Sequence, residues 1–475
     1  VTLAEDLTAA LVFGAGSSTT GTVSVAADKK IVGAITSATT AAIGATTEGI
    51  LTFANAATDT VLASTTIGTS ANALKALNVG AATAVTGTVT GAVFATTVTT
   101  AGAGTTKFSG LVTATTINAD GTGTLDSDAG LTAAVVFGAD GTIDMAAGKI
   151  LIGSAQTDTT DTGTLTFATH TADGTIVVNN GATGTSSTNR LKALNISVNN
   201  TATTASQATH TGAAYAKTIT ADASVATDTI QFSGVVNADT LNLDGAGTFT
   251  LNGDVTAAVV VSGDSTTTVA AGKIITGAVT NDSGTSGQGT LNLSNTAAAA
   301  ITLTTSTIGA SGALLKAVNI TNSDDEATTL AGNIFATAVT ATATDNLDLI
   351  TFSGTVNGTT LNVAGAGQSS FSEDINAGVV FANTVSTTGA ATVAANKKIV
   401  GAVTTATTDQ GILTFTATTA DTTLASSTIG ATDKLLKAVN VTSTANTATL
   451  AGNVFATTVT ATATDDTGSD KVAFS

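Results

Sequence analysis

The sequence predicts an all-β protein, an elongated β-solenoid of the parallel β-helix kind. Three observations predict this fold: a narrow alphabet of small and β-branched residues without proline, short stretches that alternate apolar residues with threonine, and motifs that recur four times about 120 residues apart. A string of β-sandwich domains, one per period, remains the alternative, because ~120 residues is a normal sandwich size.

The composition favours strands over helices. Ala, Thr, Gly and Val dominate, 43% of the residues are apolar, only 3% are aromatic, and Pro, Cys and Trp are absent. A core made of small and β-branched side chains fits closely spaced, pleated strands better than the wide gaps between helices. The absence of proline suits a backbone in which every coil must donate hydrogen bonds to the next.

The repeat is carried by a Leu-Lys-Ala-Leu/Val-Asn-Val/Ile motif. Its lysines are Lys75, Lys192, Lys316 and Lys437, which lie 117, 124 and 121 residues apart. An aromatic residue follows each motif by about twenty positions, at Phe94, Tyr215, Phe335 and Phe455, with spacings of 121, 120 and 120. This fixed period indicates a tandem array. We divide the chain into repeats at 1–118, 119–242, 243–363 and 364–475.

Two further anchors support the same period. Phe-Ser-Gly begins at Phe108, Phe232 and Phe352, and Phe474-Ser475 matches its start. An Ala-Ala-x-Val-Phe-like segment ends at Phe13, Phe137, Val261 and Phe381. Both ends of the sequence fall inside a repeat, as expected for a segment of a longer array.

The local pattern within a repeat is strand. Residues 163–167, 360–363 and 411–415 place apolar and polar side chains alternately, the two-residue period of a half-buried strand. Clusters of Gly, Asn, Asp and Ser between such runs predict tight turns. Helix is expected at most as one turn over 433–439.

The solenoid is favoured over the sandwiches because small residues suit its narrow interior and because the repeats vary in length, as coils with loops do. With perhaps twenty to twenty-five residues per coil and strands ~4.8 Å apart, the chain would form a rod on the order of 100 Å long.

The charge excludes some partners. Fifteen basic and 33 acidic residues give a net charge of −18, which disfavours nucleic acid and anionic membranes on electrostatic grounds. No apolar run is long enough to span a membrane, and Val1 opens directly into strand-like sequence without an export signal. We therefore expect mature protein or an internal segment, with any membrane anchor outside it.

Three stretches carry a family resemblance: 163–167, 306–320 and 331–337. They resemble the repeats of very large bacterial β-strand-repeat surface proteins, and autotransporter passenger domains are similar. The resemblance extends over all four periods and rests on low-complexity sequence. It implies export, a β-solenoid shaft, and a role as adhesin, surface layer or extracellular fibre. No outer-membrane barrel segment is present, which leaves the export route open, and no catalytic residues are carried over.

The leading functional hypothesis is a structural protein of an extracellular bacterial filament, matrix fibre or surface layer that self-associates through stacked repeats. The alternative is an adhesin shaft or binding module that presents a distal tip to a cell-surface glycan or host ligand, or a viral or phage fibre. An enzyme is not expected, because no local cluster of catalytic side chains is apparent. Calcium is the one cofactor considered for this chain, and no other is expected.

The calcium candidates are acidic residues near turns. Asp6, Asp254 and Asp374 occupy one matched position, and the second repeat has Gly130 there with acidic residues nearby. Carboxylates and turn carbonyls are the oxygen ligands calcium takes, but carboxylates also cap turns and keep sheets soluble. Residues 324–326 and 465–466 are further candidates. The candidate set is Glu5, Asp6, Asp126, Asp128, Asp254, Glu373 and Asp374.

The remaining candidates have structural interpretations. His170 and His210 lie in Thr-rich sequence without counterparts in the other repeats, and a solvated surface position is expected for both. The four matched lysines are expected to expose their ammonium groups, with an intersubunit ion pair as the alternative. Four Asn-x-Ser/Thr sequences, at Asn195, Asn319, Asn357 and Asn440, fit a glycosylation acceptor, but an Asn side-chain ladder or chance is favoured.

Overall fold

The computed structural model describes the chain in two compact units, Val1–Asn242 and Leu243–Ser475. The described residues are 1–475 without 15–19, 39, 44–47, 201–204, 283–284, 297–299, 324, 383–387, 419–420, 445–446 and 465–469. They form strands, turns and isolated bridges and no helix, so the single turn considered at 433–439 is wrong: strand β42 begins at Leu436. No helical segment that could cross a membrane is found in this part of the chain.

The strands of the first unit are β1 (Thr2–Leu3), β2 (Leu11–Phe13), β3 (Thr22–Val25), β4 (Ile35–Ser37), β5 (Glu48–Asn55), β6 (Thr60–Ala63), β7 (Leu74–Ala81), β8 (Thr86–Val89), β9 (Val93–Gly102), β10 (Thr105–Phe108), β11 (Val112–Ala119), β12 (Thr124–Ser127), β13 (Leu131–Phe137), β14 (Thr142–Met145), β15 (Leu151–Ile152), β16 (Ala155–Thr157), β17 (Thr162–His170), β18 (Gly174–Asn179), β19 (Leu191–Val198), β20 (Ser206–His210), β21 (Ala214–Ala223) and β22 (Thr229–Phe232). Strand β23 (Val236–Gly245) contains the boundary between the units.

The strands of the second unit are β24 (Thr248–Leu251), β25 (Val255–Val261), β26 (Thr266–Val269), β27 (Ile275–Thr276), β28 (Val279–Asn281), β29 (Gln288–Asn295), β30 (Ile301–Thr304), β31 (Leu315–Asn322), β32 (Ala327–Leu330), β33 (Ile334–Ala343), β34 (Leu349–Phe352), β35 (Val356–Gly365), β36 (Gln368–Phe371), β37 (Ile375–Phe381), β38 (Ala390–Val393), β39 (Val403–Thr405), β40 (Gln410–Ala417), β41 (Thr422–Ala425), β42 (Leu436–Ser443), β43 (Thr447–Leu450), β44 (Ala456–Ala463) and β45 (Lys471–Phe474).

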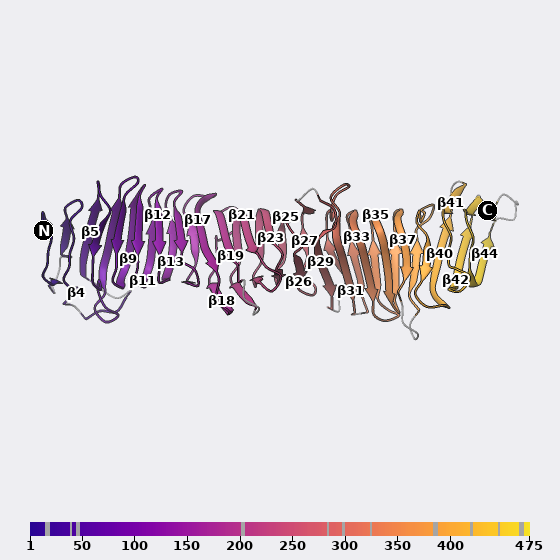
Figure 1. Cartoon of the computed structure of the whole chain (residues 1–475), viewed down its shortest axis with the longest axis horizontal. Coiled ribbons are helices and arrows are strands. Elements are labelled where there is room, and N and C mark those ends of the chain that lie inside the picture. Colours follow the sequence, from indigo (N-terminus) through magenta and orange to yellow (C-terminus); the bar gives the residue numbers. More distant parts are fainter. Residues whose placement is uncertain are drawn as a thin grey trace. The chain divides into compact units, whose positions relative to one another are not determined.

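Each unit is a parallel β-solenoid. In the first unit one ladder runs β1, β3, β5, β7, β9, β11, β13, and another runs β6, β8, β10, β12, β14, β17, β19, β21. Every pairing in these ladders is parallel, and consecutive members lie side by side (Figure 1). The predicted all-β solenoid is confirmed. The alternative of antiparallel sandwiches is wrong, because the partner of each strand lies one coil away rather than across a hairpin.

The second unit repeats this arrangement. One ladder runs β24, β26, β29, β31, β33, β35, β37, β39, and another runs β30, β32, β34, β36, β38, β40, β42, β44, again with parallel pairs throughout. Coil length varies: Phe352 pairs with Phe371, 19 residues on, whereas Gln288 pairs with Leu315, 27 residues on. Turns of different length absorb this difference outside the ladders.

The core consists of columns of stacked aliphatic side chains. In strand β13, buried and half-buried positions alternate along the whole strand, so one face of the strand points inward. Neighbouring strands then place like residues above one another, and Phe352 and Phe371 stack with ring centroids 4.9 Å apart. One column in the second unit contains Leu291, Val318, Val339, Leu361, Val379 and Val403, all at most 1% exposed.

Candidate functional site

The acidic residues predicted as calcium ligands are each engaged by groups of the protein. Near the N-terminus, Lys29 Nζ lies 2.9 Å from Glu5 Oε2, and the backbone N–H of Lys30 donates to Asp6 Oδ1 at 3.2 Å. The Glu5 hydrogen bond, with its charge, raises the pKa of Lys29. Here the two carboxylates bind the following coil.

The matched positions repeat this geometry. Lys397 Nζ lies 2.5 Å from Glu373 Oε2, and Asp374 Oδ1 accepts a hydrogen bond from the N–H of Lys398 at 3.0 Å. Asp254 Oδ1 accepts one from the N–H of Ile274 at 3.2 Å. The shared feature of Asp6, Asp254 and Asp374 is therefore a bond that caps an N–H group one coil later.

At the start of the second repeat, the acidic residues bind a lysine side chain and not a backbone N–H group. Lys107 Nζ lies 2.9 Å from Asp126 Oδ2 and 2.8 Å from Asp128 Oδ1, and these two hydrogen bonds raise the pKa of the lysine. Asp144 is the ladder neighbour of Asp126, and burial, together with the Asp126 charge, raises its pKa. The cation of Lys107 thus holds together two carboxylates that would otherwise repel each other.

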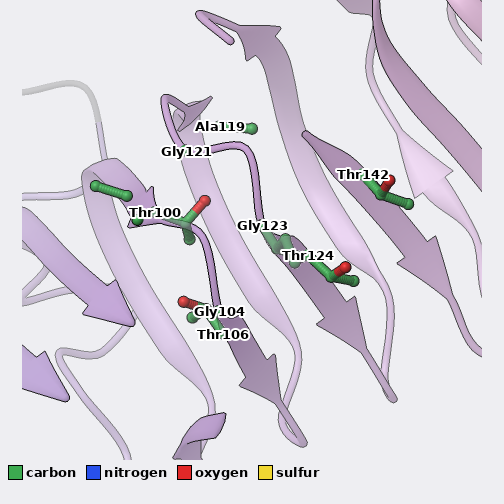
Figure 2. A pocket seen from close by; sticks show the side chains of 11 residues that line it. Thr100, Gly104, Thr106, Ala119, Gly121, Gly123, Thr124 and Thr142 are labelled. Carbon is green, nitrogen blue, oxygen red and sulfur yellow. The ribbon is translucent and has the colours of Figure 1, made fainter. Parts of the chain in front are cut away.

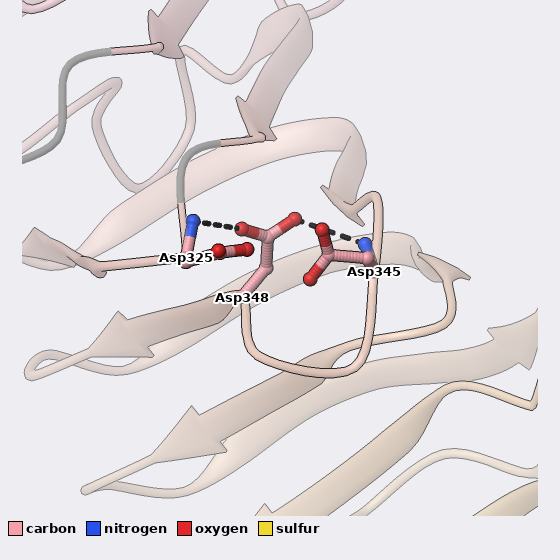
Figure 3. A group of neighbouring side chains, drawn as sticks. All are labelled: Asp325, Asp345 and Asp348. Atoms are coloured by element: carbon pink, nitrogen blue, oxygen red, sulfur yellow. Dashed lines mark hydrogen bonds between the residues drawn. The ribbon is translucent and has the colours of Figure 1, made fainter.

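Another group of carboxylates comes closest to a cation-binding geometry. Among the described residues, the oxygens of Asp325, Asp345 and Asp348 lie within 4.8 Å of one another (Figure 3). Asp325 belongs to the predicted acidic stretch 324–326, whereas Asp345 and Asp348 were missed. Asp324 and residues 465–466 lie outside the described part of the chain.

The geometry of this group is that of a capped turn. Asp348 is 1% exposed, and its Oδ1 accepts the N–H of Asp325 at 3.0 Å. Its Oδ2 accepts the N–H of Asp345 at 3.0 Å and the hydroxyl of Thr344 at 2.8 Å. The buried carboxylate is therefore satisfied by donors of the protein, as a buried charge requires. Asp325 and Asp345 are exposed.

The two histidines are buried, which corrects the expected solvated positions. His170 is 7% exposed and His210 is 0% exposed. The alternation of strand β20 turns His210 inward, although its Thr-rich sequence is typical of a loop. Its Nδ1 lies 3.1 Å from the carbonyl of Gly212, so Nδ1–H donates there, and Nε2 lies 2.7 Å from Thr183 Oγ1 and 3.2 Å from Asn179 Nδ2. Burial lowers its pKa to about 4.

The matched lysines are exposed, as predicted. Two form ion pairs inside the chain: Lys192 Nζ lies 2.7 Å from Asp140 Oδ2, and Lys316 Nζ lies 2.7 Å from Asp264 Oδ2. The Lys192 hydrogen bond lowers the pKa of Asp140. At the matched positions, Lys75 and Lys437 donate instead to Thr20 and Thr388, at 3.1 and 3.3 Å.

The Asn-x-Ser/Thr sequences lie in strands, and all four of their asparagines take part in side-chain ladders between coils. Asn195 Nδ2 donates to Thr166 Oγ1 at 3.2 Å, and Asn319 Nδ2 donates to Asn292 Oδ1 at 2.8 Å. Asn440 makes the same contact with Thr414 at 3.5 Å. Asn357 Oδ1 accepts from Nδ2 of Asn376, its partner in the next coil, at 2.8 Å, and its own Nδ2 donates to the carbonyl of Ile334 at 3.3 Å and to Thr355. The favoured ladder interpretation thus describes all four asparagines.

A small hollow in the first unit lies where β9 and β11 lead into β10 and β12. It is lined by glycines at 102, 104, 121 and 123 with Thr100, Thr106 and Thr142 around them (Figure 2). Its volume of about 10 Å³ has room for roughly one water molecule. This hollow cannot hold a substrate.

Comparisons with protein-family models, with curated proteins and with solved structures find no match. The functional argument therefore depends on the residues of this chain.

Proposed function

We propose that this chain is a structural segment of an extracellular bacterial filament, matrix fibre or surface layer. In this proposal it consists of four tandem repeats of about 120 residues and assembles by self-association. The resemblance to bacterial β-strand-repeat surface proteins supports the location outside the cell. The role requires neither nucleic acid nor insertion into a membrane, in keeping with the net charge of −18.

The observation that carries the proposal is the continuity of the parallel ladders in each unit. In the second unit, strands from β29 to β39 pair in one unbroken succession, and their inward residues form a continuous column. Each coil contacts only its neighbours, so the stabilising contacts add up with the number of coils. Such an arrangement resists bending and proteolysis, which are the properties a fibre needs.

The outward face supports the same role. It carries Thr and Asn side chains that bond from coil to coil, as Asn78 Nδ2 does to Thr52 Oγ1 at 3.3 Å and Asn362 Nδ2 does to Thr340 Oγ1 at 3.4 Å. Side chains tied in ladders lose little further freedom when another surface packs against them. We propose that copies associate through these flat faces.

No catalytic role is proposed. Both ring nitrogens of His210 face groups of the core, and the acidic residues bind the adjacent coils through backbone N–H groups or lysines. A catalytic acid or base must instead reach a substrate in a cleft.

The test is negative-stain electron microscopy of the purified chain at increasing concentration, with and without a calcium chelator. Ordered filaments or sheets are expected, and particles that stay single at every concentration contradict the proposal. Loss of assembly in the chelator would show that calcium takes part. Assembly that is indifferent to the chelator would remove calcium from the account.

The second candidate is an adhesin shaft, or a viral or phage fibre, in which the chain itself also binds a ligand. A polar groove in the second unit, described in the next subsection, is the observation that supports this second candidate. If the chain is an adhesin shaft, the same microscopy experiment should show single particles, and a binding assay should detect a ligand.

A further inference from the structure

A groove of about 620 Å³ opens on the second unit where three successive strands end. Its floor is formed by the turns at 305–307, 331–333 and 353–355, which follow β30, β32 and β34, and Ala278 and Glu373 lie at its two ends. The groove is wide open to solvent, so a ligand would lie along it and would not be enclosed. None of the acidic or histidine candidates apart from Glu373 contributes to this groove.

The concave floor depends on glycine. A Cβ atom added to Gly332 would lie 2.2 Å from the backbone of Ser306, and one added to Gly354 would lie 2.5 Å from the backbone of Gly332. The second and third turns can stack this closely on the turn before them only because their middle residues, Gly332 and Gly354, have no side chain. The side chains on both sides of the glycines therefore repeat along the groove at the coil spacing of about 4.8 Å.

The walls offer hydroxyl and amide groups. The side chains of Thr305, Ser306, Thr307 and Ser353 have no hydrogen-bond partner in the described part of the chain. Asn333 Oδ1 accepts the N–H of Thr355 at 2.9 Å and its hydroxyl at 3.1 Å, which fixes the orientation of the amide. Its Nδ2 group, unbonded among the described residues, remains to donate to a ligand.

Glu373 supplies the one charge of the lining. Lys397 Nζ binds its Oε2, which holds the carboxylate in a fixed position, and Oε1 has no partner among the described residues. A carboxylate held in this way accepts hydrogen bonds from neutral O–H donors more strongly than a neutral oxygen does. No lysine or arginine lines the groove, so the lining itself offers an anion no cationic partner.

These polar residues depart from the sequence period. The positions that match Thr355 hold Leu111 and Val235, which are 41% and 38% exposed. The positions that match Asn333 hold Ala92 and Ala213, or Asn453 in the fourth copy, and those that match Glu373 hold Ala129 and Gly253, or Glu5 in the first. Among the corners that the structure describes, this groove is where all three polar residues occur together. The packing of one coil on the next, which every corner shares, therefore does not explain why they are polar here.

We propose that this groove binds an uncharged, extended oligosaccharide. Its lining offers no cation, no aromatic side chain and no broad apolar wall, but its hydroxyl, amide and carboxylate groups can both donate to and accept from a row of sugar hydroxyls. The groups recur at the coil spacing, which is close to the length of one sugar unit in an extended chain. The inference goes beyond the structural role and does not depend on self-association.

The test is calorimetric titration of the full chain with three neutral hexasaccharides: β-1,4-linked glucose, β-1,4-linked N-acetylglucosamine and α-1,4-linked glucose. Saturable binding of at least one β-1,4-linked chain is expected. An acidic hexasaccharide, β-1,4-linked like the first two, serves as the charge probe and is expected to bind at least tenfold more weakly. Failure of all three neutral chains, or stronger binding of the acidic chain, overturns the proposal.

The matched variant is Asn333→Ala/Thr355→Val/Glu373→Ala, in which each new residue is the one found at a matched position. The solenoid accommodates these residues elsewhere, so folding is expected to survive, and circular dichroism checks it. Affinity should fall at least tenfold. Ser109→Ala alters the corner of the first period that matches Ser353 and should leave affinity unchanged. Equal affinity in the triple variant, or an equal loss in Ser109→Ala, places any binding elsewhere and overturns the proposal.

Discussion

A single buried histidine changes the chemistry of one core column. In the first unit, Leu151, Asn179, His210 and Phe232 follow one another in the ladder. The matched columns hold Ile31, Ala63, Val89 and Phe108, then Ile275, Thr304, Leu330 and Phe352, then Ile399, Ala425, Leu450 and Phe474. The Asn179–His210 pair thus introduces hydrogen-bonding groups at positions where the fourth column has Ala and Leu.

We expect this pair to make the coil around β20 sensitive to acid. Folding lowers the pKa of His210 from 6.5 to about 4, so the unfolded chain takes up a proton in that interval and the folded chain does not. The contribution of His210 to the free energy of unfolding is fully present above pH ~6.5. It decreases by about 3 kcal/mol as the pH falls towards ~4, at ~1.4 kcal/mol per pH unit. The protection factors of the backbone amides in β18, β20 and β22, which are hydrogen-exchange rates corrected for the intrinsic rate at each pH, should therefore decrease as the pH falls across this interval.

The control is Asn179→Ala/His210→Leu, which installs the residues of Ala425 and Leu450. It should remove the decrease in protection between pH ~6.5 and ~4, because it removes the imidazole while leaving every carboxylate in place. An unchanged pH dependence in this variant would show that other groups cause it.

At the scale of the strand, one glycine decides whether a coil can close over an aromatic residue. Gly163 in β17 has φ +79°, and an added Cβ would lie 2.3 Å from Cγ of Phe137. Gly411 has φ +80° and would meet Phe381 at 2.4 Å. The pairing of a left-handed glycine with the aromatic end of the preceding strand explains why both sequence signals recur together.

Gly163→Ala should therefore destabilise the first unit by more than about 1 kcal/mol, because it adds left-handed strain to a contact that cannot relax without moving a buried ring. Urea denaturation measures the change in the free energy of unfolding. Gly174→Ala is the matched control, since Gly174 also has positive φ but an added Cβ would meet nothing within 4 Å. If both variants lose the same stability, strain alone accounts for the loss and the contact with Phe137 contributes nothing.

At the scale of the whole molecule, the surface is strongly acidic and contains few cations. The net charge is −18 and the pI is about 4.1, while exposed pairs such as Lys192–Asp140 are each worth at most ~1 kcal/mol. Copies that approach one another through neutral Thr and Asn faces must therefore overcome a general repulsion between like charges.

On the proposed self-association, raising the salt concentration from about 0.01 M to about 0.15 M should speed assembly, because the screening length falls from ~30 Å to ~8 Å. Light scattering at neutral pH measures the rate, and circular dichroism checks that the fold is unchanged. Slower assembly at higher salt would instead indicate that ion pairs between copies hold the assembly together.

The sequence by itself determined the fold class and the exposure of the lysines. Two-residue alternation assigns each side chain to a face of its strand, and the absence of proline permits unbroken ladders, so residues 163–167 and 411–415 could be placed without coordinates. It also indicated that the Lys motif recurs because the whole repeat recurs. These properties depend on near neighbours in the chain, which a sequence displays directly.

Only the tertiary structure decided which residues meet from coil to coil. Partners lie 19 residues apart at Phe352 and 27 apart at Gln288, so turn length shifts the register and a linear pattern cannot fix it. For that reason the burial of His210, the convergence of Asp325, Asp345 and Asp348, and the polar groove could not be predicted. Their chemistry depends on side chains that are distant in sequence and are brought together by the stacking of coils.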